Sequence, residues 1–238
     1  MKRINLFAST GLFICLFLLT IGCKKAEPKV EEPAVVAIDP YAGTIPSVSY
    51  QAIMIKYNVA SYPKWKEVYL NNAPNRQSYG ITDGYIGRGT EDTSSAIVLN
   101  KVADLQKAKD FGASPKVKTV MQKEGLTKPP IVAFLDVIRD DTSSIPENNR
   151  VIVAHRVKDF DTWLKAYDGE GRAARAANGL LDRGLAREME DPAMVYIVFA
   201  VTDKEKAMAR MQSEELKKLM TEAGVEGPPA FYFFKWEK

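Results

Sequence analysis

The chain has 238 residues, of which 46% are hydrophobic and 26% are charged, and its formal net charge is +3 at pH 7. Without the two basic residues at the extreme N-terminus, Lys2 and Arg3, the charge is 3 − 2 = +1. A nearly neutral chain without a basic run interleaved with aromatic residues is not expected to bind nucleic acid. One histidine and two cysteines, one of them in the N-terminal apolar run, do not form the common zinc patterns, and we predict no metal site.

Residues 1–22 have the layout of a secretory signal peptide, with two basic residues and an uncharged apolar run. The segment that ends at Cys23 resembles the lipobox of bacterial lipoproteins, although Thr20 stands where that pattern prefers leucine. The resemblance implies cleavage before Cys23, a lipid such as palmitate on its thiol, and membrane anchoring in the bacterial cell envelope. Lys24, in place of aspartate, implies the outer membrane. The alternatives are ordinary signal cleavage nearby or an uncleaved anchor.

Residues 23–48 are rich in proline, charge and small residues, and no periodic apolar pattern persists in them. This composition predicts a flexible linker between a lipidated Cys23 and a folded domain. The alternative is a partly ordered strap across the surface of that domain.

From about residue 49 the chain contains the same pattern twice, as repeats at 49–140 and 150–238. Of the 52 positions from 83 to 134, 15 are identical to the position 99 residues later, where chance would give roughly three. The identical residues in the first repeat are Asp83, Arg88, Glu91, Asp92, Val102, Asp104, Lys107, Ala108, Ser114, Lys118, Met121, Gly125, Pro129, Pro130 and Phe134. We therefore predict two copies of one structural unit.

Each repeat has the same order of predicted elements, which is clearest in the second. A β-branched strand at 151–157 precedes a helix that Asp159 caps and that ends at Asn178-Gly179. Two strands follow at 180–188 and 193–201. A capping box at 202–205 begins a helix that runs to Ala223, and the last strand is 230–236. The order is βαββαβ, the ferredoxin-like arrangement, in which one face of the sheet remains bare.

The last strand indicates how that face is covered. Phe231 and Phe233 alternate with Ala230, Tyr232 and Phe234, so both faces of the strand are apolar and we expect neither to contact water. The predicted fold class is therefore α+β, with two tandem ferredoxin-like repeats packed sheet to sheet as an intramolecular α+β barrel.

This order of elements, together with the stretch from 155 to 168, resembles the dimeric α+β-barrel superfamily and in particular the antibiotic-biosynthesis-monooxygenase family. In that superfamily two chains usually pair their sheets, so the resemblance implies a monomer that acts as a pseudo-dimer. The superfamily includes cofactor-free oxygenases, haem-degrading enzymes, isomerases and proteins without known activity, so the fold leaves the function open.

His155 is the only histidine, and it lies near the end of the first strand of the second repeat, where the first repeat has Tyr57. A lone histidine can serve as a base, a proton shuttle or an axial haem ligand. The alternative is a structural, hydrogen-bonded histidine in a packed layer.

Two further groups recur in both repeats. Trp65 and Tyr69, matched by Trp163 and Tyr167, follow one helix face and predict either an aromatic-lined ligand cavity or core packing. Arg88, matched by Arg187, predicts either a clamp for a ligand carboxylate or an ion pair with the acidic residues of the following hairpin.

The absence of a reactive set favours an envelope lipoprotein that either has no catalytic role or binds a small apolar or aromatic ligand without a cofactor. The first alternative is a cofactor-free oxygenase or haem-type enzyme acting through His155, with Trp163, Tyr167 and Arg187 shaping its pocket. The second is a protein-interaction module, which predicts an apolar surface patch and no cavity.

Overall fold

The computed structural model describes residues 43–115, 117, 119 and 125–237, which lie within one unit of the chain, Ile38–Lys238. The predicted signal peptide, Cys23 and most of the linker 23–48 lie outside the described residues, as do Lys118 and Met121 of the repeat pattern. Among the described residues, no helix is both long enough and apolar enough to cross a membrane.

Both repeats have the predicted order of elements. The first repeat comprises β1 (Ser47–Val59), α1 (Tyr62–Asn71), α2 (Ala73–Ser78), β2 (Ile81–Gly89), β3 (Ser95–Val102), α3 (Leu105–Ala113) and β4 (Leu126–Asp140). The second comprises β5 (Asn149–Val157), α5 (Phe160–Glu170), α6 (Arg172–Ala177), β6 (Leu180–Glu188), β7 (Met194–Val201), α7 (Lys204–Gln212), α8 (Glu214–Glu222) and β8 (Val225–Glu237). Short polar side chains begin several of the helices, as the sequence indicates.

The helices of the second repeat are more divided than the sequence predicts. The first is interrupted at Gly171, whose φ of 82° is readily adopted by glycine and which separates α5 from α6. The second is interrupted at Ser213, whose hydroxyl accepts a hydrogen bond from the backbone N–H of Leu216 at 3.2 Å and begins α8. The cap of α7 is Asp203, whose carboxylate accepts from the N–H of Lys206 at 3.1 Å, so the predicted box begins one residue later than Thr202.

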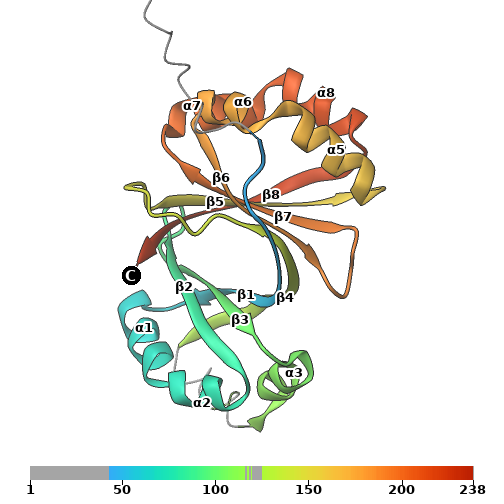
Figure 1. Ribbon diagram of the computed structural model, residues 1–238. Coiled ribbons are helices and arrows are strands. Elements are labelled where there is room, and N and C mark those ends of the chain that lie inside the picture. Colours follow the sequence, from blue (N-terminus) through green and yellow to red (C-terminus); the bar gives the residue numbers. More distant parts are fainter. Residues whose placement is uncertain (1–42, 116, 118, 120–124, 238) are drawn as a thin grey trace, which may run out of the picture. The chain divides into compact units, whose positions relative to one another are not determined.

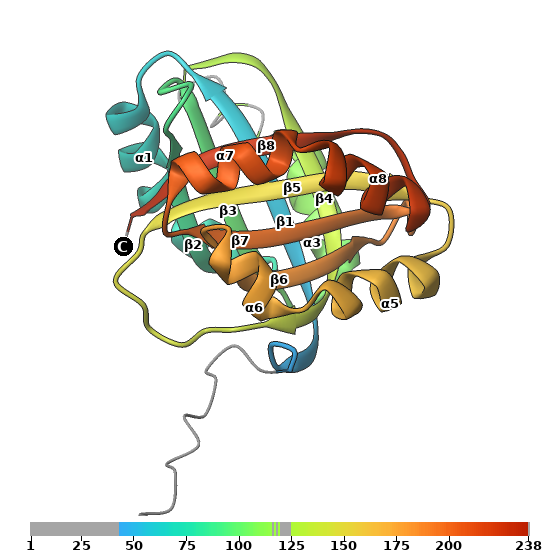
Figure 2. The same ribbon diagram turned by 90° about the horizontal axis from the view of Figure 1, so that it is seen from above.

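The eight strands form one closed antiparallel barrel in the order β1-β3-β2-β8-β5-β7-β6-β4. Within it the repeats have the equivalent orders β4-β1-β3-β2 and β8-β5-β7-β6, and they meet at two seams, β2 with β8 and β4 with β6. The helices of the two repeats lie on opposite outer sides (Figure 1), and the strands of the two halves cross one another between them (Figure 2). The predicted intramolecular α+β barrel is confirmed.

Alternation along each strand gives the barrel two kinds of buried surface. On β5, Val151 and Val153 pack under the helices of the second repeat, whereas Ile152 and Ala154 pack in the barrel lumen with side chains from the first repeat. His155 has the same parity as the helix-facing residues, and Arg150 has the parity of the lumen. One strand therefore supplies polar residues to two separate compartments.

The expectation that water contacts neither face of the last strand is only partly met. Phe234 is buried, with its ring against Gly87, where a Cβ would lie 2.4 Å from the ring. Phe231, in contrast, is 39% exposed. The reason is that the β2–β8 seam is short. Only Phe234–Glu237 pair with β2, so the preceding part of β8 pairs with β5 alone and forms an edge.

Candidate functional site

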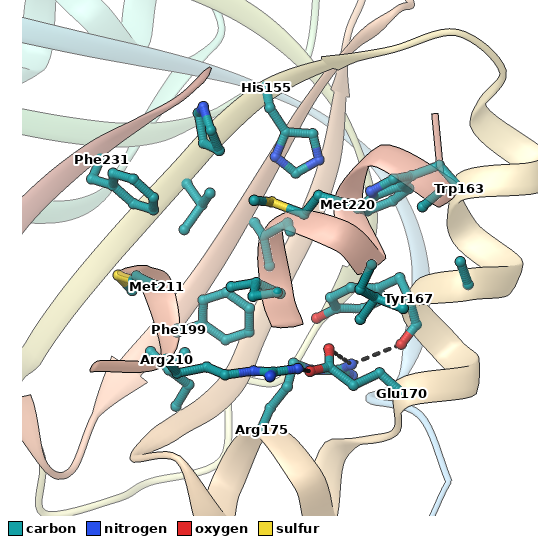
Figure 3. A pocket seen from close by; sticks show the side chains of 18 residues that line it. His155, Trp163, Tyr167, Glu170, Arg175, Phe199, Arg210, Met211, Met220 and Phe231 are labelled. Atoms are coloured by element: carbon teal, nitrogen blue, oxygen red, sulfur yellow. Dashed lines mark hydrogen bonds and ion pairs between the residues drawn. The ribbon is translucent and has the colours of Figure 1, made fainter. Parts of the chain in front are cut away.

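A cavity of about 90 Å³ lies between the helices of the second repeat and the outer face of its sheet (Figure 3). Strand β5 contributes Val153 and His155, and α5 contributes Trp163 and Tyr167. The remaining wall is mainly aliphatic, aromatic and thioether side chains from the other strands and from α7 and α8: Leu180, Ile197, Phe199, Met211, Leu216, Leu219, Met220, Ala223, Pro229 and Phe231. Such a wall favours a small apolar or aromatic group.

His155 is the polar side chain of the sheet side of this cavity. It is 5% exposed, and neither Nδ1 nor Nε2 has a hydrogen-bond partner among the described residues. Its ring lies 5.4 Å from the ring of Trp163, in an edge-on arrangement. Burial lowers the pKa of the imidazole from 6.5 to about 4, so the side chain is neutral at pH 7, with one ring nitrogen that donates and one that accepts.

Charged residues form the opposite end of the cavity, where Arg210, Glu170 and Arg175 lie together (Figure 3). Arg210 Nη2 lies 2.8 Å from a Glu170 carboxylate oxygen, and Arg175 Nη1 lies 3.2 Å from the other. Arg175 also makes two parallel hydrogen bonds to Asp182, at 2.8 and 2.7 Å. Within the described residues each positive charge at this end is thus opposed by a carboxylate, and none of them is free for an ionic ligand.

Searches of the sequence against models of known families and against curated proteins find no match. Several solved structures have the same fold. An anthrone oxidase-like protein aligns with a TM-score of 0.55 and 14% identity, over 81% of this chain and 95% of its own. A candidate monooxygenase from Fusobacterium nucleatum aligns with a TM-score of 0.54 and 11% identity, over 80% and 94%. One from Lactobacillus acidophilus aligns with a TM-score of 0.51 and 14% identity, over 79% and 95%.

The chain has the fold of the monooxygenase-like α+β barrels. At these identities the likeness concerns the fold alone, and the chemistry must be argued from the residues of this α+β barrel.

An arginine–aspartate pair that is not among the predicted site residues supports the first helix of each repeat. In the first repeat Arg76 makes two hydrogen bonds of 2.7 Å to Asp83, and in the second Arg175 makes the equivalent two to Asp182, at 2.8 and 2.7 Å. Each guanidinium also donates to the backbone carbonyl of the helix tyrosine, Tyr69 or Tyr167, and lies 3.6 or 3.9 Å from the centre of its ring. The recurrent spacing, 83 − 76 = 7 and 182 − 175 = 7, was the available signal.

The aromatic residues predicted for a ligand wall have different positions in the two repeats. Trp163 and Tyr167 line the His155 cavity of the α+β barrel. Trp65 is fully buried in a ring cluster, 5.3 Å from Tyr57 and 5.2 Å from Tyr69, and forms core. Tyr57 and Tyr69 also border a separate hollow of about 370 Å³ beside α3.

The two recurrent arginines predicted as ligand clamps, Arg88 and Arg187, do not line the His155 cavity. Arg187 donates to the carbonyl oxygen of Pro192 at 3.0 and 3.1 Å and lies over the ring of Phe160 at 4.2 Å. Arg88 donates to the carbonyl of Thr93 at 3.2 Å and lies 5.2 Å from the ring centre of Tyr62. Among the described residues neither arginine forms the ion pair expected with its hairpin acids. Both hold a hairpin through its backbone, which explains their recurrence.

Proposed function

We propose that the second repeat of the α+β barrel binds a small neutral molecule with an apolar or aromatic body and one hydrogen-bonding group. The observation that supports this most directly is His155, whose two ring nitrogens lie buried beside an apolar cavity and have no partner in the described part of the chain. A buried polar group without a partner costs about 1–3 kcal/mol, and a ligand hydroxyl would relieve that cost.

A ligand of the size of one aromatic ring would have to enlarge this cavity. At about 90 Å³ it is smaller than the engineered apolar cavity of roughly 150 Å³ that accommodates benzene. Two of its walls are the side chains of Met211 and Met220, which are flexible and adapt to irregular shapes. The paired charges at its far end favour a neutral ligand over an ion.

The alternative of a cofactor-free oxygenase that uses His155 as its base has less support. The candidate monooxygenases and the anthrone oxidase-like protein share the fold, but a general base works best when its pKa lies near the working pH. Burial lowers the pKa of His155 to about 4, which leaves a weak base at pH 7. Of the pocket residues proposed for that enzyme, Trp163 and Tyr167 line the cavity and Arg187 does not.

A haem does not fit the residues present. A macrocycle of that size would need a pocket within or above the range of roughly 300–1,000 Å³ that drug-sized ligands occupy, and this cavity is about 90 Å³. The arginines nearest to it, Arg175 and Arg210, are already paired with carboxylates and are not free to hold propionates. A pure interaction module, which would have no cavity, has correspondingly little support.

Phenol and toluene provide a matched test of the proposed role of His155. Because His155 is the only histidine, the imidazole signals of tag-free protein report on this site alone in nuclear magnetic resonance titrations. We expect phenol to bind about five-fold more tightly than toluene, since one neutral hydrogen bond contributes roughly 1 kcal/mol. In His155→Leu we expect the preference to disappear or to reverse.

Tyr57→Phe, at the equivalent strand position of the first repeat, is the control and should leave both affinities unchanged. If neither probe shifts the imidazole signals at millimolar concentration, or if the phenol preference survives in His155→Leu, the binding proposal is wrong. Oxygen consumption with phenol that disappears in His155→Leu would instead support the oxygenase.

We also propose that Cys23 carries a lipid that anchors the barrel in the cell envelope, as its resemblance to a lipobox implies. In bacteria grown with labelled palmitate, the full chain should incorporate label and fractionate with outer membranes. Cys23→Ala should lose the label and remain as a longer, uncleaved precursor. Labelling that persists in Cys23→Ala would contradict the assignment.

A further inference from the structure

The lumen of the barrel contains a second cavity, separate from the His155 site. It measures about 350 Å³ and is lined by residues of both repeats. That volume lies within the usual range for small-molecule pockets, roughly 300–1,000 Å³. Met54 and Leu135 of the first repeat and Ile152 and Leu185 of the second form much of its apolar wall. The stacked rings of Tyr85 and Trp236, 4.5 Å apart, add an aromatic surface beside the β2–β8 seam.

Among the described residues, one buried cation in this lumen has no carboxylate within ion-pairing distance. Arg150, at the start of β5, is 6% exposed, and its Nη1 donates to the backbone carbonyls of Glu147 and Asn149 at 2.7 and 3.0 Å. Among residues 43–115 and 125–237, no carboxylate lies within ion-pairing distance of its guanidinium, and no protein acceptor meets its Nε or Nη2. Burial, with the nearby positive charge of Arg183, lowers the pKa of Arg150 to about 10.

Among the described residues, the other charged groups of the lumen have partners of several kinds. Asp140 accepts a hydrogen bond of 2.7 Å from the hydroxyl of Tyr50. Asp141 lies 3.3 Å from Arg183, and Lys101 lies over the ring of Tyr50 at 4.4 Å. Burying a charge without a partner is costly, so Arg150 is the group that an incoming anion would stabilise most.

We infer that the barrel lumen is a binding site for a small monocarboxylate with an apolar or aromatic body, whose carboxylate pairs with Arg150. The planar guanidinium matches a carboxylate through two parallel N–H groups. The body of the ligand would lie against the apolar walls and the rings of Tyr85 and Trp236. Asp140 and Asp141 in the same lumen disfavour ligands with more than one negative charge.

Benzoate and benzyl alcohol distinguish this inference from nonspecific apolar binding, because they have similar bodies and differ in charge. By isothermal titration calorimetry we expect the full chain to bind benzoate in the lumen and to bind benzyl alcohol there at least tenfold more weakly. Benzyl alcohol that enters the His155 cavity is recognised separately, because it shifts the His155 imidazole signals. Arg150→Met should weaken benzoate binding at least tenfold, since a charged hydrogen-bonded pair contributes roughly 1.5–3 kcal/mol. Binding of benzyl alcohol should not change.

Two controls locate the site. Arg156→Met removes one positive charge from an exposed position near the other end of the same strand and should leave benzoate affinity unchanged. His155→Leu should also leave it unchanged, and benzoate should not shift the His155 imidazole signals, so this result is independent of the proposed phenol site. If Arg150→Met binds benzoate as the wild type does, or if the wild type binds none at millimolar concentration, the inference is wrong.

The melting temperature provides a second readout for Arg150→Met. Removing an unpaired buried cation should keep or raise the melting temperature without ligand. Benzoate should raise the melting temperature of the wild type and not that of the variant. An equal rise in both would contradict a role for Arg150.

Discussion

Between pH 6.5 and pH 4 the wild type should lose about 3 kcal/mol of folding stability that His155→Leu keeps. The pKa of His155 is about 4 in the folded chain because of burial, whereas an unfolded chain has the ordinary value of 6.5. As the pH falls through this window, the unfolded state therefore binds the proton first, and folding loses stability. The difference between the unfolded pKa of 6.5 and the folded pKa of about 4 corresponds to about 3 kcal/mol, at about 1.36 kcal/mol for each unit of pKa difference.

Urea unfolding at pH 7.0, 5.5 and 4.0 would measure this effect as the difference between the two proteins. At pH 7 the leucine variant should be as stable as the wild type or more so, because two unsatisfied ring nitrogens are removed. The carboxylates titrate in both proteins and cancel in the comparison. Parallel curves for the two proteins over this range would show that His155 is not buried as a neutral group.

Replacing Arg175 with methionine should destabilise the second repeat by about 3–5 kcal/mol, because the change leaves Asp182 buried without its partner. Both residues are about 5% exposed, and two hydrogen bonds join them. Burial alone would lower the pKa of Arg175, but the hydrogen bonds and the charge of Asp182 outweigh burial and raise that pKa. The measurement is the free energy of unfolding at pH 7.

The duplication supplies a matched comparison for this prediction. Arg76→Met removes the equivalent cation of the first repeat, but the side chain of Asp83 is 27% exposed and can be hydrated. We expect the loss there to be about half as large. Equal losses at the two positions would show that burial of the carboxylate does not control the cost.

The architecture was predictable from the sequence because two signals agreed. The sequence repeat predicted two units of the same fold. The apolar residues on both faces of the last strand predicted that a second sheet covers the first. The sequence could not indicate the length of each seam, which depends on long-range register. For that reason the exposure of Phe231 was unexpected, although the burial of Phe234 was expected.

The candidate sites were less predictable than the fold. Periodicity placed Trp163 and Tyr167 on one helix face beside His155, and these residues do line one cavity. The sequence did not single out Arg150, because an arginine at the start of a strand is common. Whether it lacks a carboxylate partner depends on where the carboxylates of other elements lie in the fold. Arg175 and Asp182 were missed because their interaction joins a helix to a strand across a turn.

The position of Arg150 has a consequence for the number of ligands that each barrel can hold. The matched residue of the first repeat, 150 − 98 = 52, is Ala52. A barrel assembled from two identical chains would present every interior side chain in duplicate about its twofold axis. Here the two halves differ, so one guanidinium stands alone. A benzoate titration should accordingly saturate at one equivalent per polypeptide, with the bound molecule held in a single orientation.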